Sequence, residues 1–451
     1  MSGGAPSLVG VADDEQTTKI SQESEKIVPL IDDIYAQEYP DGGARAWLVV
    51  FGTACVTFST FGYVNAWGAF QDFYQETLLR DSSASNMQRM DRLCTGSSFF
   101  LNAFLSLNAW QYSMVFFPAV ISGHYFDRGY FKIPFFIASV VLIAATFLVA
   151  QCTTYWQFLL CQGFLVGICC GILFGSMNAV VGHWFKKKRG IATGLLAAGS
   201  SVGGTMVPIV VRNLIPRVGF PWTIRIMGFI LVFSLGTANL TVRRRLPPKH
   251  VPGGLFHFAA FKNPAYSVYC VSAIMAFLGI YTVLTYIGVS AVHAGLPSGF
   301  SFYLVSIANG ASLLGRVLSS LAVDRYGPVN TMAPMTVLAA LLTYVWPLAR
   351  SKGSFVAIAV IYGLTSGAYV SSFLLPLFHL GDIADVGRRA GMTMSLTALG
   401  ALAGPPISGA INTRSGGYGA VGIYAGSVVL VSVALMLTTR QLVLKQLYGK
   451  F

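Results

Sequence analysis

The chain alternates long apolar runs, each about the length of a bilayer crossing, with short polar links. A helix of about twenty apolar residues spans the roughly 30 Å hydrocarbon core and pairs its own backbone polar groups. Hydrophobic residues make up 54% of the chain and charged residues 10%, well below the roughly one quarter charged that is usual in soluble domains. The sequence therefore predicts an all-α, polytopic membrane protein.

About twelve runs have the length and composition of membrane spans. The predicted spans cover residues 46–70, 99–123, 133–150, 155–181, 191–211, 222–241, 266–289, 300–323, 332–348, 355–378, 392–411 and 420–437. Residues 88–108 differ from their surroundings, because a charged stretch there runs directly into an apolar one. We interpret this stretch as either a lineage insertion or an artefact of the gene model.

The longest polar link in the second half of the chain separates six predicted spans from six others and contains Arg243-Arg244-Arg245. The predicted organisation is a disordered cytoplasmic tail at 1–45, a six-helix bundle at 46–241, a cytoplasmic linker at 242–264, a second bundle at 265–440 and a cytoplasmic tail at 441–451. The first 45 residues lack the pattern of a secretory signal.

Basic residues concentrate in the links on one side of the predicted membrane, including Lys186 to Arg189 and Arg243 to Arg245. The positive-inside rule then places both termini in the cytosol, and we expect a plasma-membrane protein. The net charge of +13 does not indicate nucleic-acid binding, because the densest basic run lies between two spans. The lipid bilayer is the expected environment of the chain.

The seven cysteines show neither paired nor metal-ligand spacing, so we expect no disulfide, metal or cofactor. A membrane-embedded enzyme would need clustered His, Asp or Glu at membrane depth, and the six histidines are scattered. We therefore do not expect an enzyme. A transporter-like nutrient sensor is a remote alternative, because the tails are short for a signalling extension.

Two short motifs occur once in each half, displaced by roughly two hundred residues. Gly123 to Gly129 follows the second span, and Asp324 to Gly327 follows the eighth. Arg189 to Gly194 enters the fifth span, and Arg389 to Gly391 enters the eleventh. This repetition predicts two pseudo-symmetric six-helix bundles with a substrate site between them near the midplane.

The first motif resembles the cytoplasmic Gly-x-x-x-Asp-Arg-x-Gly signature of the major facilitator superfamily. The matching residues are Gly123, Asp127, Arg128, Asp324 and Arg325. We interpret them as a conformational latch at the cytoplasmic mouth. Each Asp and Arg can pair with the other, with a helix end or with a neighbouring loop, and that contact would form in one state and break in the other.

A narrower resemblance begins at Asp41-Gly42-Gly43-Ala44-Arg45-Ala46-Trp47, which is similar to a motif of the monocarboxylate porter family. Residues 61–70 and 183–199 resemble the fungal branch of that family. The resemblance implies a secondary transporter that moves a small organic molecule by alternating access. No nucleotide-binding loop occurs in the sequence, so a gradient is the expected driving force.

Arginines within spans are the sharpest signal for a binding site, because an unpaired charge at mid-bilayer costs about 2.5–3.5 kcal/mol. Arg316 lies about two turns from Asp324 and could grip an anionic substrate, or it could reach the cytoplasmic face and belong to the latch. Arg225 is expected to reach the outer interface.

The sequence departs from this family at two positions that matter for proton coupling. Proton-coupled members look as though they use a lysine in the first helix and an aspartate in the eighth, and the matching residues here are Asn65 and Ser312. A proton therefore stays open as the coupling ion. Neutral polar side chains could line the cavity with Arg316, namely Asn65, Asn178, Asn309, Tyr286 and Tyr369.

Two cargoes remain open: a monocarboxylate-type organic anion, favoured by the family and Arg316, and an exported fungal secondary metabolite, favoured by the missing Lys and Asp. We expect the carrier to work as a monomer. The glycines of the fifth span, among them Gly194 and Gly199, are interpreted as packing positions that let helices approach closely.

Overall fold

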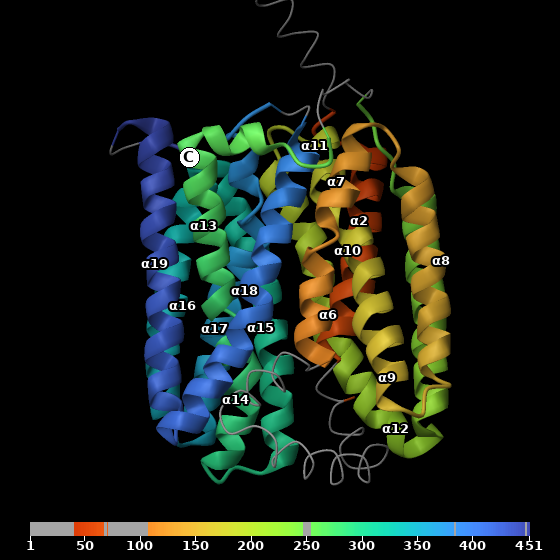
Figure 1. The fold of residues 1–451 in the computed structure, drawn as a ribbon, viewed down its shortest axis with the longest axis vertical. Coiled ribbons are helices and arrows are strands. Elements are labelled where there is room, and N and C mark those ends of the chain that lie inside the picture. Colours follow the sequence, from red (N-terminus) through yellow and green to blue (C-terminus); the bar gives the residue numbers. More distant parts are fainter. Residues whose placement is uncertain (1–39, 67–69, 71–106, 247–253, 383–384, 447–448) are drawn as a thin grey trace, which may run out of the picture.

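The computed structural model describes residues 40–66, 70, 107–246, 254–382, 385–446 and 449–451. Every regular element within these ranges is a helix, and the long helices stand side by side with their axes nearly parallel (Figure 1). We call the upper end in Figure 1 the latch face; it carries the start of the first helix and the end of the last.

The first half of the chain supplies one bundle. Its elements are α2 (Ala44–Asn65), α6 (Leu107–Phe116), α7 (Ala119–Asp127), α8 (Lys132–Val149), α9 (Tyr155–Phe158), the π-helix η2 (Leu159–Val166), α10 (Gly167–Gly175), α11 (Met177–Trp184) and α12 (Arg189–Thr241). Although α12 is continuous by hydrogen bonding, it contains two crossings. They meet at Gly219, whose φ of 76° is readily adopted only by glycine.

The second half supplies the other bundle. Its elements are η3 (Phe258–Lys262), α13 (Pro264–Gly279), α14 (Thr282–His293), α15 (Ser298–Tyr326), α16 (Pro328–Val345), η4 (Trp346–Leu348), α17 (Lys352–Ser372), η5 (Leu375–Phe378), α18 (Val386–Ser415) and α19 (Tyr418–Leu444). Local caps fix some of these starts. The side chain of Asn263 accepts a hydrogen bond from the Ala265 amide at 3.0 Å, and Ser351 forms a capping box with Ser354.

Ten helical stretches of the described chain are long and apolar enough to cross a membrane. One of them, α12, accounts for two predicted spans, and the pair α6 and α7 corresponds to the second predicted span. Each of the twelve predicted spans therefore has a helical counterpart. The part of the second span before Leu107, and nearly all of the unusual stretch 88–108, lie outside the described residues.

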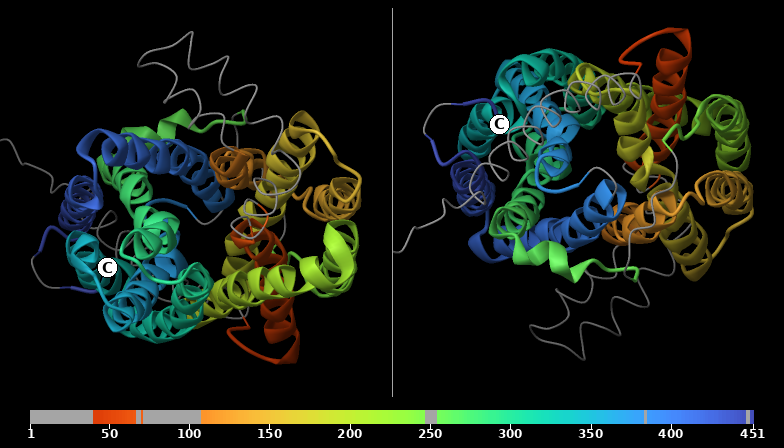
Figure 2. Two further views of the ribbon diagram at one scale, coloured as in Figure 1. Left: turned by 90° about the horizontal axis from the view of Figure 1, so that it is seen from below. Right: turned by 90° about the horizontal axis from the view of Figure 1, so that it is seen from above.

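Seen along the long axis, the helices form two groups that meet along a central seam (Figure 2). On one side of the seam α12 packs against α15, and on the other α18 packs against α6 and α7. Within the first bundle α12 packs closely on α2, where a Cβ on Gly203 would come within 2.9 Å of the Gly62 Cα. Small residues thus allow the close helix approach that the sequence predicted.

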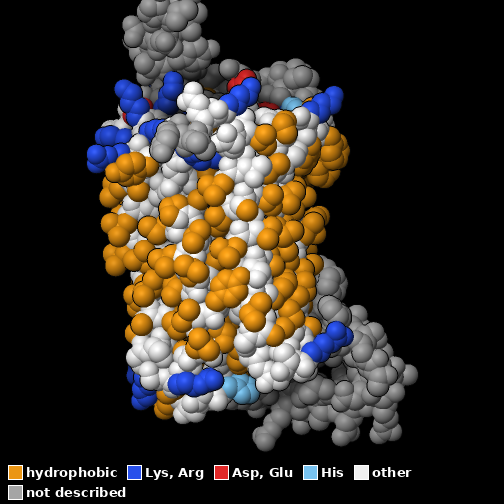
Figure 3. Space-filling model, turned by 90° about the vertical axis from the view of Figure 1, so that its left-hand side faces the viewer, with side chains coloured by type: hydrophobic (Ala, Val, Ile, Leu, Met, Phe, Trp, Pro, Cys, Tyr) orange, Lys and Arg blue, Asp and Glu red, His pale blue; other side chains and the backbone are white. Residues whose placement is uncertain are grey.

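The flank of the molecule carries a broad band of hydrophobic side chains, and Lys and Arg gather at its two ends (Figure 3). Large apolar residues are also exposed on α8 and α12 of the first bundle, among them Phe136, Phe229 and Phe233, the last 80% exposed. Such a band matches the hydrocarbon core of a bilayer. The exposed apolar surface is therefore the lipid-facing surface of a multi-pass membrane protein.

Candidate substrate pocket and latch

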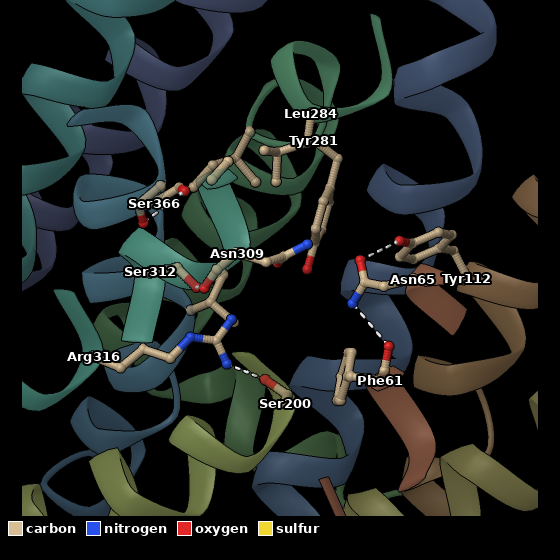
Figure 4. A pocket seen from close by; sticks show the side chains of 15 residues that line it. Phe61, Asn65, Tyr112, Ser200, Tyr281, Leu284, Asn309, Ser312, Arg316 and Ser366 are labelled. Carbon is tan, nitrogen blue, oxygen red and sulfur yellow. Dashed lines mark hydrogen bonds between the residues drawn. The ribbon is translucent and has the colours of Figure 1, made fainter. Parts of the chain in front are cut away.

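A pocket lies between the two bundles near the middle of the seam, with about 540 Å³ of empty space that includes its open part. Helices of both halves line it (Figure 4). Its lining includes Phe61, Asn65, Tyr112, Ser200, Tyr281, Leu284, Asn309, Ser312, Arg316 and Ser366. A smaller pocket adjoins it toward the latch face and shares Phe61, Ser200, Arg316 and Val370 with it.

Arg316 on α15 is 8% exposed and lines both pockets. Its guanidinium donates to the backbone oxygen of Ala197 at 2.6 Å and to the hydroxyl of Ser200, both on α12 of the other bundle. Its buried Nε has no hydrogen-bond partner among the described residues. Of the two positions left open by the sequence, the structure therefore has Arg316 in the central cavity and not at the latch.

Asn65 extends into the pocket from the wall opposite Arg316 (Figure 4). Its side-chain nitrogen donates to the Phe61 carbonyl at 2.8 Å, and its oxygen accepts from the Tyr112 hydroxyl at 3.2 Å. The rings of Tyr112 and Tyr281 lie 5.7 Å apart, so the two bundles also meet through aromatic side chains here. The pocket thus combines one cation with neutral hydrogen-bonding groups and aromatic surface.

Three other residues that the sequence predicted to line the cavity, Asn309, Asn178 and Tyr286, differ in where they lie. Asn309 lines the central pocket and donates to the Gly204 carbonyl at 3.4 Å, whereas Asn178 lines only the smaller pocket. Tyr286 lines neither, because its hydroxyl donates to the Pro405 carbonyl at 2.8 Å.

Tyr369 is also absent from the linings of both described pockets. Its ring is 1% exposed and stacks on Phe373 at a centroid distance of 6.1 Å. Packing within the second bundle therefore accounts for it. The placement of Tyr286 and Tyr369 in the cavity is corrected accordingly.

The first latch contact joins Asp127, at the end of α7, to the start of α18. Its carboxylate accepts from the Arg388 amide at 2.8 Å and also from the Gly387 amide. A Cβ on Gly123 would overlap the Gly387 carbonyl, so this position of the motif has no room for a side chain. Burial above all raises the pKa of Asp127 to about 7.

The second latch contact is its counterpart in the other half. The carboxylate of Asp324 accepts from the Gly190 amide at 2.7 Å and the Ile191 amide at 3.0 Å, at the start of α12. Each aspartate thus binds the positive end of a helix in the opposite bundle. The sequence left several possible partners open for each aspartate, and in the structure the partner of both is the start of a helix. Arg128 and Arg325 are exposed beside them, and Arg325 lies over the Tyr326 ring.

The Asp41 motif has a local role at the same face. The Asp41 carboxylate accepts from the backbone amides of Lys186 and Lys187 at 2.6 and 2.7 Å, just before α12 begins. Next to it, the Arg189 guanidinium lies 4.0 Å from the ring centre of Phe378 across the seam. The Arg189 contact and the two aspartates join the bundles at the latch face, and we call this arrangement the latch-closed state.

Two joined helical bundles with a charged pocket at their seam define a membrane carrier, a class that does not include enzymes. The chain belongs to the Major Facilitator Superfamily, whose model matches residues 49–379. A solved structure of the human organic anion transporter MFSD10 shares this fold, with a TM-score of 0.72 at 12% identity over 87% of this chain and all of that one.

Two fungal relatives are similar over most of their length. The MFS-type transporter 1 of Ophiocordyceps is 33% identical over 94% of this chain and 92% of its own. The aspyridones efflux protein of Emericella nidulans is 32% identical over 88% of this chain and 77% of its own. These findings establish the superfamily and do not support the narrower assignment to monocarboxylate porters.

Proposed function

We propose that this transporter exports an anionic organic metabolite from the cytoplasm, with Arg316 as the anion-binding group. The observation that carries the proposal is that Arg316 alone is charged among the described residues lining the two pockets. A buried guanidinium favours a carboxylate or enolate, and the surrounding aromatic rings favour an extended apolar body. The efflux function named for the Emericella relative supports the direction of transport.

We propose that the latch face is cytoplasmic, because it carries Lys186 to Arg189 and Arg243 to Arg245. The aspartate contacts then close the cytoplasmic side and must break for the substrate to enter. The carrier would act as a monomer in the plasma membrane.

The described pocket lining contains no carboxylate that could carry a proton. We therefore propose that the anion leaves alone, driven by the negative interior of the cell. One elementary charge gains about 2.3 kcal/mol per 100 mV of membrane potential, which is enough to drive export without a second ion.

The test uses purified protein in proteoliposomes with an imposed potassium diffusion potential. We expect flux of the aromatic acid orsellinate that follows the potential, no flux of its methyl ester, and loss of flux in Arg316→Ala. Orsellinate flux that requires a pH gradient would contradict the uncoupled mechanism. Flux of lactate alone would favour the second candidate, a monocarboxylate carrier, which the Asp41–Trp47 motif supports.

A further inference from the structure

The segment Gly449–Phe451 folds back onto the corner between α15 and α16. The Phe451 carbonyl accepts from the amides of Val329 and Asn330 at 3.0 and 3.1 Å, in the first turn of α16. Phe451 itself is 3% exposed. The segment therefore caps a helix start and buries an aromatic side chain, which is the geometry of a docked peptide.

The same segment also holds the end of α15. The ammonium group of Lys450 donates to the backbone carbonyl of Asp324 at 2.7 Å, and the Gly449 carbonyl accepts from the side chain of Asn330 at 2.7 Å. Arg440 on α19 donates to the side chain of Asn330 at 2.6 Å and so ties the last helix to this corner. Three helices of the second bundle thus meet at the tail.

The surface that Gly449–Phe451 contacts leaves no room for a side chain at Gly327. Gly327 has a φ of 95°, and a Cβ there would lie 2.7 Å from Phe451 backbone atoms. The Phe451 ring lies edge-on to His379 at a centroid distance of 5.9 Å. Burial above all, and the positive charges of Arg189 and Lys450, lower the pKa of His379.

The first bundle has an equivalent arrangement. Arg244 follows the sixth crossing as Lys450 follows the twelfth, and it donates to the backbone carbonyl of Asp127 at 3.3 Å. Its guanidinium also lies 5.3 Å from the ring centre of Phe126. In each half, a basic side chain that follows the last helix therefore donates to the backbone carbonyl of the latch aspartate of the same half, Arg244 to Asp127 and Lys450 to Asp324.

We infer that Gly449–Phe451 is a built-in clamp that stabilises the latch-closed state through Asp324. The carboxylate of Asp324 must stay in place to accept the two amides of α12. Burial raises the pKa of Asp324, the charge of Lys450 counters that rise, and the Lys450 hydrogen bond fixes the Asp324 backbone. Release of the segment would shift the population toward the latch-open state. The inference concerns this equilibrium and does not depend on the identity of the substrate.

The test measures access to the smaller pocket from the latch face. Ser371, which lines that pocket and is 5% exposed, is replaced by cysteine in a chain whose seven native cysteines have been substituted. A membrane-impermeant maleimide is applied separately to each face of sealed vesicles. Deleting 449–451 is expected to raise the labelling rate from the latch face by about tenfold or more, because the deletion removes the charge-assisted hydrogen bond of Lys450 together with the contacts of Gly449 and Phe451.

Single substitutions distinguish the loss of the Lys450 contact from a general effect of altering the tail. Lys450→Ala should raise labelling several-fold, whereas Lys445→Ala removes the same charge from an exposed position and should leave the rate unchanged. Arg244→Ala should act like Lys450→Ala from the other half. If Lys450→Ala labels as slowly as Lys445→Ala in proteins with equal melting temperatures, the clamp is refuted, even where the deletion variant fails to fold.

Discussion

The positive charge of Arg316 is partly satisfied by hydrogen bonds within the protein. Its two acceptors, Ala197 and Ser200, belong to α12, while Arg316 belongs to α15. The side chain therefore links the bundles at mid-membrane as well as facing the pocket. An arriving anion would compete with these acceptors, and its binding would loosen the link between α12 and α15.

Substitution of Arg316 tests its part in binding. Arg316→Ala should weaken orsellinate binding by about 10- to 100-fold, since a hydrogen bond to a charged group contributes about 1.5–3 kcal/mol. Arg316→Lys should recover only part of this, because a single ammonium cannot replace the guanidinium fork. Titration of intrinsic tryptophan fluorescence provides the measurement.

Arg225→Ala is the matched control for the loss of an arginine from a membrane helix. Arg225 lies 4.9 Å from the ring centre of the exposed Trp222 and is absent from the linings of both pockets. Its substitution should leave binding unchanged. Equal losses in the two variants would show a general effect of removing a membrane arginine.

Asp127 makes the latch sensitive to pH. Its pKa is raised to about 7 in the latch-closed state and should fall toward the usual value of about 4 once the carboxylate meets water. The closed state thus binds the proton more tightly, so acidification favours closure. Asp385, Arg388 and His124 lie around this site, and burial together with the charges of Arg128 and Arg388 lowers the pKa of His124.

Between about pH 8 and about pH 6, the ratio of closed to open protein should rise about tenfold. Pulsed electron resonance between spin labels on Tyr130 and Tyr326, exposed at the latch face of opposite bundles, would measure it. Asp127→Asn should reduce the pH dependence while leaving the closed state populated, and the part that remains should come from Asp324, whose pKa burial also raises. A variant that keeps the full dependence would assign it to another group.

At the scale of single helices, α12 offers a test of close packing. A Cβ on Gly199 would overlap the Ala54 carbonyl of α2, whereas nothing lies within 4 Å of a Cβ on Gly236. Gly199→Ala should cost about 1–3 kcal/mol of stability. Gly236→Ala on the same helix should be neutral or gain up to about 1 kcal/mol. Thermal unfolding in detergent compares the two, and similar melting temperatures would contradict the packing argument.

Apolar run length predicted the crossings well, because the bilayer imposes one length on every span. Run length cannot show breaks within a crossing. The second crossing is interrupted between α6 and α7, next to Pro118, and the fourth contains the π-helix Leu159–Val166. Both depend on how neighbouring helices satisfy the backbone, which is tertiary information.

The binding residues were only partly predictable for a related reason. Arg316, Asn65 and Asn309 were predicted because polar groups are costly in lipid and must face the interior. Whether an interior side chain reaches the pocket depends on helix rotation, so Tyr286 was misplaced. Tyr112 and Tyr281 were missed, since aromatic residues are common in membrane helices and no pattern distinguishes those that line a pocket.

For the molecule as a whole, the seam should open at the latch face during transport. The Ser395 hydroxyl of α18 donates to the Phe117 carbonyl at 2.6 Å across the seam. A short, disulfide-containing bifunctional maleimide that joins cysteines introduced at these two positions should stop transport, and reduction of the linker should restore it. Flux of fully cross-linked protein would show that the bundles need not part there.

The hydrogen bonds that Arg316 makes to α12 are expected to affect both substrate affinity and transport rate. In the proposed binding mode, the free energy of substrate binding is the difference between two sets of hydrogen bonds, because the guanidinium would exchange Ala197 and Ser200 for acceptors on the substrate. Such an exchange limits the affinity, and it also shortens the lifetime of the loaded carrier on the discharge side. A carrier that binds its substrate through such an exchange is expected to combine a high KM with a high turnover rate.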